Sequence, residues 1–137
     1  MKIYSNSIQI LIKFLDVEKS NWFFNITTIC DLNALGSLMS LEVLVYEEPE
    51  INFQIIANQF DSQKQVEIDP LGTILIRLLE DTVKRGGGFG RKASVEISNE
   101  GYLCAVQFSW NEPGAGTPDV DWIQALKGIE YLEMDFE

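Results

Sequence analysis

The stretch most suggestive of chemistry is basic and rich in glycine, and it runs from Arg85 to Lys92 (RGGGFGRK). A phosphate-binding loop needs the pattern GxxxxGK[ST] between a strand and a helix, so that backbone N–H groups face the phosphates. Here Gly90 is followed by Arg91, and the surrounding pattern predicts a helix before the loop and a strand after it. Because a helix C-terminus carries partial negative charge, it repels phosphate. We therefore expect no nucleotide site here.

Half of the chain's basic residues nevertheless gather within 16 positions, and all three arginines are among them: Arg77, Lys84, Arg85, Arg91 and Lys92. One interpretation is a basic loop that grips an acidic group on a partner, through Arg85, Phe89, Arg91 and Lys92. The alternative, which we favour, is a group of cations that complements a helix C-terminus and is followed by a flexible connector.

Acidic residues are concentrated at 47–50 and at 112–137, where seven acids face only Lys127. Asp119 and Asp121 are close enough in sequence for acid–base chemistry. Their place in the first turn of a predicted helix, where carboxylates favour the helix dipole, explains them without catalysis. We predict an acidic partner-binding surface, with Trp122 or Tyr131 as an aromatic anchor. Its acids are Glu47, Glu48, Glu50, Asp119, Asp121, Glu133, Asp135 and Glu137. The simpler alternative is a set of solvated outer faces.

Several kinds of catalytic site are excluded by composition. The chain has no histidine, which removes Ser-His-Asp and Cys-His triads and histidine-based zinc sites. Two distant cysteines, Cys30 and Cys104, make neither a CxxC pair nor a four-cysteine zinc site. No calcium-loop spacing is present. We expect no cofactor, no metal and no small-molecule substrate.

The cysteines also bear on the compartment. Each lies in an apolar run, which favours two buried thiols over a disulfide. The N-terminal stretch has charges within its apolar run and no small-residue cleavage site, which argues against a signal peptide. No apolar run reaches the roughly 18 residues that a membrane span needs. These features together predict a cytoplasmic protein.

Two helices are expected from caps and apolar spacing. Asp69 and Pro70 precede apolar residues at helical spacing, which predicts a long helix over about 70–85 that ends at Gly86. Thr117 and Pro118 open a short helix over about 118–127.

Alternation of apolar and polar residues predicts the strands. They cover 8–14, 22–30, 41–46, 51–60, 65–69, a hairpin of 95–97 with 102–110, and 132–136, where a continued helix is the alternative. The predicted fold class is α+β: one domain over 1–137, with an antiparallel or mixed sheet of about six or seven strands and both helices packed on it.

The charge balance is the strongest guide to function. Twenty-one acids against ten bases give a net charge of −11, which is repelled by nucleic acid and membrane phosphates and attracted to a basic partner. In size, charge and lack of catalytic groups the chain resembles bacterial toxin-immunity proteins, although no specific motif is shared. That resemblance implies a non-enzymatic inhibitor that masks a basic toxin domain such as a nuclease. The alternatives are a small carboxylate-based enzyme and a structural or assembly subunit.

Overall fold

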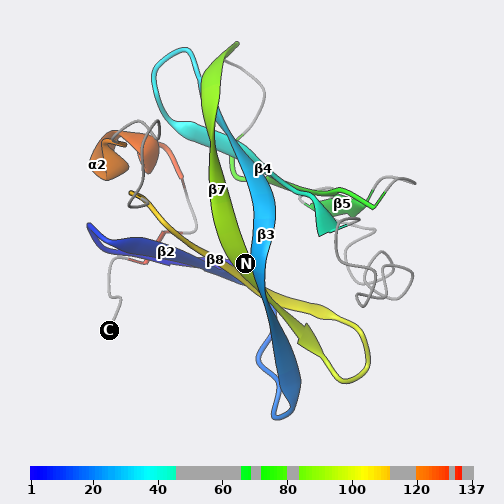
Figure 1. The fold of residues 1–137 in the computed structure, drawn as a ribbon. Helices are drawn as coiled ribbons and strands as arrows, with labels where there is room; N and C mark the ends of the chain where they lie inside the picture. Colours follow the sequence, from blue (N-terminus) through cyan, green and yellow to red (C-terminus); the bar gives the residue numbers. More distant parts are fainter. Residues whose placement is uncertain (46–65, 69–71, 80–83, 112–119, 130–131, 134–137) are drawn as a thin grey trace.

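The chain folds around one curved sheet. A computed structural model describes residues 1–45, 66–68, 72–79, 84–111, 120–129 and 132–133. These residues form a nine-stranded sheet with the strand order β5-β6-β4-β3-β7-β8-β2-β1-β9, which curls into a half-barrel (Figure 1). Neighbouring strands are antiparallel, except that β1 and β9 are parallel.

The strands differ widely in length, from two residues to fourteen, and only one short helix occurs among the described residues. The strands are β1 (Lys2–Ser5), β2 (Gln9–Lys13), β3 (Ser20–Asn33), β4 (Leu38–Val43), β5 (Val66–Ile68), β6 (Ile74–Arg77), β7 (Arg85–Ser98), β8 (Leu103–Ser109) and β9 (Leu132–Glu133). The helix is α2 (Trp122–Ala125).

The pair of β3 and β7 forms the spine of the sheet. Each strand has fourteen residues, and they pair from Ser20 opposite Ser98 to Asn33 opposite Arg85. Two irregularities interrupt the register, one between Phe23 and Ile26 and one after Leu32. In Figure 1 this long ribbon runs the height of the molecule, and the other strands diverge from it on both sides.

The two halves of β7 have different neighbours. Residues Ser94–Ile97 lie between β3 and β8, whereas residues 85–93 pair with β3 alone among the described parts of the chain. The sheet therefore forks at Ser94. One arm continues through β8, β2, β1 and β9, and the other through β4, β6 and β5.

The apolar core covers the inner face of both arms. Ile10 and Ile12 of β2 and Val106 of β8 are buried, as are Leu41 and Ile76 in the other arm. Trp110 closes the core just after β8. Its indole Nε1–H donates to Ser5 Oγ at 3.0 Å and to the Asn6 carbonyl at 3.1 Å, which ties β8 to the β1–β2 turn.

The predicted α+β architecture is wrong, because the described residues are mostly antiparallel sheet with a single short helix. The region of the expected long helix over 70–85 contains strand β6 and the first residue of β7. Ile74 and Ile76 are buried while Leu75 and Arg77 are half-buried, which is the alternation of a strand. The stretch TILIRLL satisfies a period of two as well as the helical period, and pairing with β4 and β5 selects the strand.

The second predicted helix, over 118–127, is reduced to the four residues of α2. Asp121 caps it, accepting a hydrogen bond from the Gln124 N–H at 3.2 Å. Thr117 and Pro118 lie outside the described residues, as do Asp69, Pro70 and the predicted strand over 51–60.

The prediction of a flexible loop at the glycines is also wrong, because they belong to β7. A Cβ at Gly86 would lie 2.6 Å from both the Ala34 Cα and the Asn33 carbonyl oxygen. A Cβ at Gly88 would lie 2.8 Å from the Cys30 carbonyl oxygen. Glycine at these two positions therefore lets β7 approach β3 closely, and it serves packing instead of flexibility.

This difference between glycines can be tested by comparing Gly86→Ala with Gly90→Ala. The nearest atom to a Cβ at Gly90 is the Thr28 carbonyl oxygen, at 4.0 Å. We expect Gly86→Ala to lower the free energy of unfolding by about 1–3 kcal/mol, as overpacking does. Gly90→Ala should change it by no more than about 0.5 kcal/mol. Urea denaturation measures both values, and equal losses would contradict the packing explanation.

The prediction of two buried thiols is confirmed: Cys30 in β3 and Cys104 in β8 are buried, and neither forms a disulfide. Burial raises the pKa of the Cys104 thiol, and the nearby Glu96 carboxylate raises it further. We therefore expect Ellman's reagent to label the native protein slowly and to find two thiols after denaturation. Rapid labelling of the native protein would show that the strands around these cysteines open readily.

Candidate functional site

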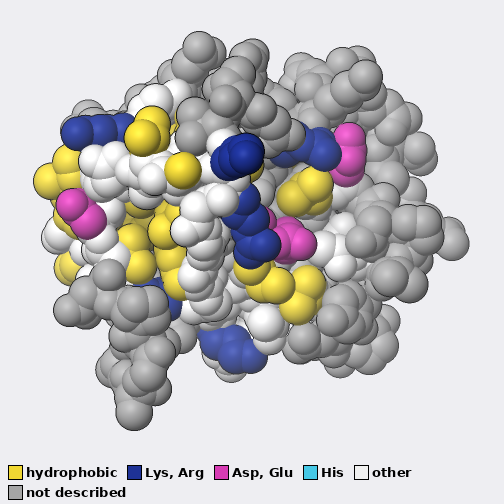
Figure 2. All heavy atoms as spheres, turned by 90° about the horizontal axis from the view of Figure 1, so that it is seen from above, with side chains coloured by type: hydrophobic (Ala, Val, Ile, Leu, Met, Phe, Trp, Pro, Cys, Tyr) yellow, Lys and Arg dark blue, Asp and Glu magenta, His cyan; other side chains and the backbone are white. Residues whose placement is uncertain are grey.

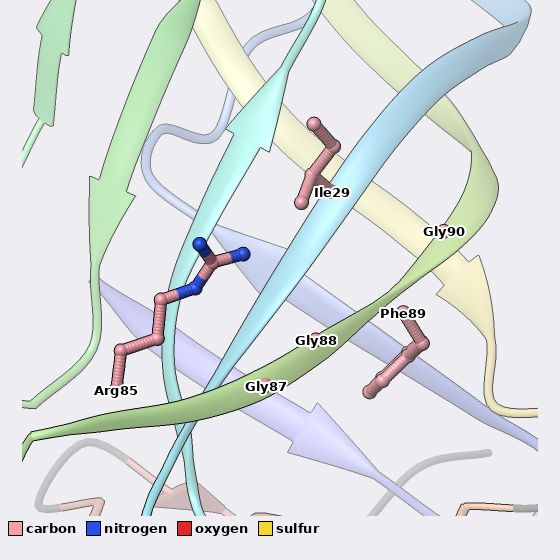
Figure 3. Close-up of a pocket in the computed structure, with 6 residues that line it drawn as sticks. All are labelled: Ile29, Arg85, Gly87, Gly88, Phe89 and Gly90. Atoms are coloured by element: carbon pink, nitrogen blue, oxygen red, sulfur yellow. The ribbon is translucent and has the colours of Figure 1, made fainter.

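An open hollow lies over the glycine half of β7. Its volume is about 540 Å³, and it is lined by Ile29, Arg85, Gly87, Gly88, Phe89 and Gly90. Figure 3 shows the Ile29 and Arg85 side chains on one side of the β7 ribbon and Phe89 on the other. Because glycines form the floor, the backbone of β7 is accessible here, and Gly86, Gly87, Gly88 and Gly90 are all exposed.

The strand register sets polar side chains beside this hollow in rows across the outer face. Asp31 of β3 lies between Gly88 and Ser40, and Ser40 in turn lies opposite Arg77. In the next row Ile29 lies between Gly90 and Glu42. Successive residues of a strand face opposite sides of the sheet, so these rows share the outer face.

Asp31 is the centre of this polar group. Its side chain is only 8% exposed, and its Oδ1 lies 2.8 Å from Arg85 Nη2. The contact between Arg85 and Asp31 Oδ1 lacks hydrogen-bond geometry, so it is an ion pair held by the attraction of opposite charges. Ser40 Oγ–H donates to Oδ2 at 3.0 Å. The irregular register after Leu32 sets Arg85 opposite Asn33, which brings its guanidinium to the face where Asp31 lies.

Glu42 and Asp31 share this environment, and the pKa of Glu42 is raised above its ordinary value of 4.5. The largest cause is a hydrogen bond with Asp31, which favours the protonated Glu42 carboxyl. Burial and the charge of Asp31 act in the same direction, while Arg85 opposes them. A carboxyl group with a raised pKa can act as a general acid, as acid–base chemistry requires.

The predicted basic loop of Arg85, Phe89, Arg91 and Lys92 is not one surface. In β7 these residues divide between the two faces. Alternation sets Phe89 and Arg91 on the inner face and Lys92 on the outer face, and the irregular register after Leu32 turns Arg85 to the outer face as well. Arg85 and Lys92 are exposed on the outer face, and Lys92 Nζ donates to Thr27 Oγ1 at 2.8 Å. Phe89 is buried, and Arg91 is only 2% exposed.

Arg91 has a structural role at the fork. Its Nε–H donates to the Trp110 carbonyl at 2.8 Å, which joins β7 to the residue that follows β8. Its Nη1 donates to the Gly90 carbonyl at 2.7 Å, and its guanidinium lies 4.6 Å from the centre of the Phe89 ring. An arginine held by these contacts is not available to a partner.

Three members of the predicted acidic surface lie among the described residues. Asp121 is exposed but serves as the cap of α2, and Trp122 is half-buried and packs against the core. Trp122 is therefore not an exposed anchor. The backbone of Glu133 lies in β9. The other predicted residues lie outside the described parts of the chain: Glu47, Glu48, Glu50, Asp119, Tyr131, Asp135 and Glu137.

Sequence reasoning missed Asp31, Ser40 and Glu42. A signal was present, because Asp31 directly follows the apolar run at Cys30, and Glu42 interrupts the apolar run LEVLV. A carboxylate within a strand needs a partner on its own face. Finding that partner requires the strand order, which the sequence does not show.

The comparisons with known proteins find no match to a family model, to a curated protein or to a solved structure. Among the described residues no group of three or more His, Cys, Asp or Glu side chains could hold a metal ion. Within the same part of the chain, no helix is both long enough and apolar enough to cross a membrane. Any function must therefore be inferred from the chain itself.

The pairing of Glu42 with Asp31 predicts a specific pH dependence. Because the folded pKa of Glu42 is raised, its contribution to stability is full below 4.5 and is lost as the pH rises through the folded pKa. Glu42→Gln stays neutral at every pH. It should therefore stabilise the protein relative to wild type at about pH 7 and have little effect at about pH 4.

Urea midpoints at both pH values measure this difference. Glu100→Gln, which makes the same charge change at an exposed turn position, is the control. If Glu42→Gln destabilises the protein equally at both pH values, its carboxyl is not a proton-sharing partner of Asp31.

Proposed function

We propose that the protein is a non-enzymatic, acidic binding protein that covers a basic protein partner. The observation that carries this proposal is the distribution of charge along the chain. The described residues include nine bases and nine acids, so the sheet and its short turns are balanced. The acids are Asp16, Glu18, Asp31, Glu42, Glu67, Glu96, Glu100, Asp121 and Glu133.

The whole excess of −11 therefore lies in the remaining segments, which contain twelve acids and only one base, Lys64. In the sequence these segments lie between β4 and β7, between β8 and α2, and after α2. A balanced frame with acidic connections is suited to presenting negative charge to a partner. Figure 2 shows one face of the molecule, seen from above, on which Lys and Arg side chains lie among Asp and Glu side chains. This view supports a frame in which charge is balanced.

The most concrete version is a cytoplasmic immunity or inhibitor protein for a basic toxin domain, such as a nuclease. Carboxylates from the acidic connections would occupy the positions of substrate phosphates. Complementary charge also speeds association and favours the correct partner. The candidate acids in the connections are Glu47, Glu48, Glu50, Asp119, Asp135 and Glu137, with Tyr131 as an aromatic anchor. Asp121 and Glu133 of the frame lie near them in the sequence and complete the candidate set.

A second candidate is a small enzyme that uses carboxylates, and the Asp31–Glu42 pair is the observation that favours it. One carboxyl is protonated more readily than its ordinary pKa allows, beside an open hollow. Against this, Asp31 is buried and engaged by Arg85 and Ser40. We therefore rank the binding function first.

Charge reversal in the first acidic connection tests the binding proposal. The partner to use is the product of the neighbouring reading frame, purified in an inactivated form. We expect Glu47→Lys with Glu48→Lys to slow association about tenfold or more at low salt, because rim charges act mainly on association rate. The same change should leave the free energy of unfolding within about 0.5 kcal/mol of wild type.

The matched control is Glu18→Lys with Glu100→Lys, which makes the same charge change at exposed positions of the frame. Surface plasmon resonance at low and physiological salt measures both pairs. The proposal fails if both double variants associate at equal rates, or if the wild-type rate is independent of salt. Binding that survives Glu42→Gln would separate this function from the enzyme candidate.

A further inference from the structure

Among the described strands, the fork in the sheet leaves one side of β7 without a neighbour along the glycines. From Ser94 onward that side pairs with β8, with Ser94 opposite Gln107 and Glu96 opposite Ala105. From Arg85 to Ala93 no described strand lies there. Backbone groups on this side are therefore those of an edge strand, although β7 is central in the rest of its length.

The hydrogen-bond pattern identifies which backbone groups face this edge. The Leu44 N–H donates to the Thr27 carbonyl at 2.9 Å, so Thr27, and by alternation Ile29 and Asp31, bond to β4. The intervening residues of β3 then bond to β7. Their partners are Gly87, Phe89 and Arg91.

Gly88 and Gly90 must consequently direct their N–H and C=O groups away from β3. The Gly90 carbonyl accepts from Arg91 Nη1 at 2.7 Å. The N–H groups of both glycines and the carbonyl of Gly88 have no partner among the described residues, and both glycines are exposed. These groups have the arrangement that an added strand requires.

We propose that the edge of β7 at Gly86–Gly90 binds an extended acidic segment of a partner protein by antiparallel strand addition. Side chains of the added strand on the outer face would lie beside Gly88 and Gly90, where β7 has none of its own. An apolar side chain there would fill the hollow and contact Ile29. Such cross-strand filling of glycine sites stabilises sheets.

The charge around the edge selects an acidic segment. Lys84, Arg85 and Lys92 flank the glycines, and all three are exposed, with 60% of the Arg85 side chain accessible. Arg85 uses Nη2 toward Asp31, and a guanidinium has five N–H donors in all. Acidic residues at both ends of the added strand would therefore meet positive charge.

A second copy of this chain fits the edge less well. Antiparallel pairing of two copies about Phe89 would set Lys92 of one copy near Arg85 of the other. Like charges at facing positions destabilise a strand pair. Two chains of net charge −11 would also repel each other at long range. The edge and the acidic connections carry opposite charge, so this inference does not depend on the proposed function.

A capped heptapeptide, Glu-Thr-Val-Thr-Val-Thr-Glu, is a direct probe, with the same peptide carrying Lys in place of Glu as its control. Titration should shift the backbone amide NMR signals of Gly88 and Gly90 and protect both amides from hydrogen exchange. The Lys peptide should bind at least about tenfold more weakly, or not at all.

N-methylation of the peptide tests strand addition without altering the protein. In an antiparallel pair only alternate amides of the added strand face β7. With valines beside the glycines, methylating the valine amides should weaken binding at least about tenfold, because it removes main-chain hydrogen bonds. Methylating the threonine amides, which face away, should have little effect.

Two protein variants complete the test. In Gly90→Val the new side chain would occupy the hollow, at a position where a Cβ has room. Because a peptide side chain could then no longer fill the hollow, this variant should bind the peptide at least about tenfold more weakly. Ser94→Val is the matched control on the same strand and face, where β8 is already paired, and it should bind like wild type. Thermal denaturation of both variants verifies that they fold.

Four results would overturn the proposal. One is peptide binding without changes at Gly88 and Gly90, and another is equal binding of the two N-methylated peptides. The third is concentration-dependent dimerisation that Gly90→Val abolishes, since it would assign the edge to a second copy. Failure of both peptides to bind at millimolar concentration would also count against it.

Discussion

The structure depends on the close approach of β3 and β7. In the glycine-rich half of β7 the two backbones are so near that a Cβ at Gly86 or Gly88 would overlap backbone atoms at Cys30, Asn33 or Ala34. Glycine removes that obstacle, at the cost of side-chain packing on the outer face. The pair then extends over fourteen residues of each strand and joins the two arms of the sheet.

The same glycines explain both surfaces of interest. Without side chains on β7, the outer face is hollow beside Ile29, and Arg85 can reach across to Asp31. The β-bulge that brings Arg85 there arises where the tightly packed strands lose register. Because β8 separates from β7 at Ser94, the glycine half is also an edge, and its backbone is accessible where a strand would otherwise lie.

Charge is divided between the described residues and the segments that connect them. Among the described residues, acids and bases are equal in number, and several form local pairs, such as Arg85 with Asp31 and Arg77 with Glu67. The connections and the C-terminal segment hold the net negative charge. A sheet cannot bury unpaired charge cheaply, and buried Asp31 lies beside Arg85. In the proposed function, long-range attraction to a partner would come from the acidic connections.

The sequence by itself determined what depends on composition and short-range pattern. The absence of histidine excludes several catalytic classes, and the apolar surroundings of Cys30 and Cys104 correctly predict buried thiols. The alternation in β2 and the hairpin that joins β7 to β8 are confirmed, and the turn of that hairpin holds Gly101 at a φ of 91°. In these places one period dominates, or one residue type suits the backbone, without help from distant strands.

Tertiary structure decided the rest, because the deciding contacts are far apart in sequence. Residues 74–77 fit a helix and a strand equally by pattern, and only pairing with β4 and β5 makes them a strand. Gly86 and Gly88 look flexible in sequence but pack tightly once β3 lies beside them. The irregular register after Leu32 sets exposed Arg85 on the opposite face of β7 from buried Arg91. Asp31 and Glu42 become partners only through the β3–β4 register, which no local pattern encodes.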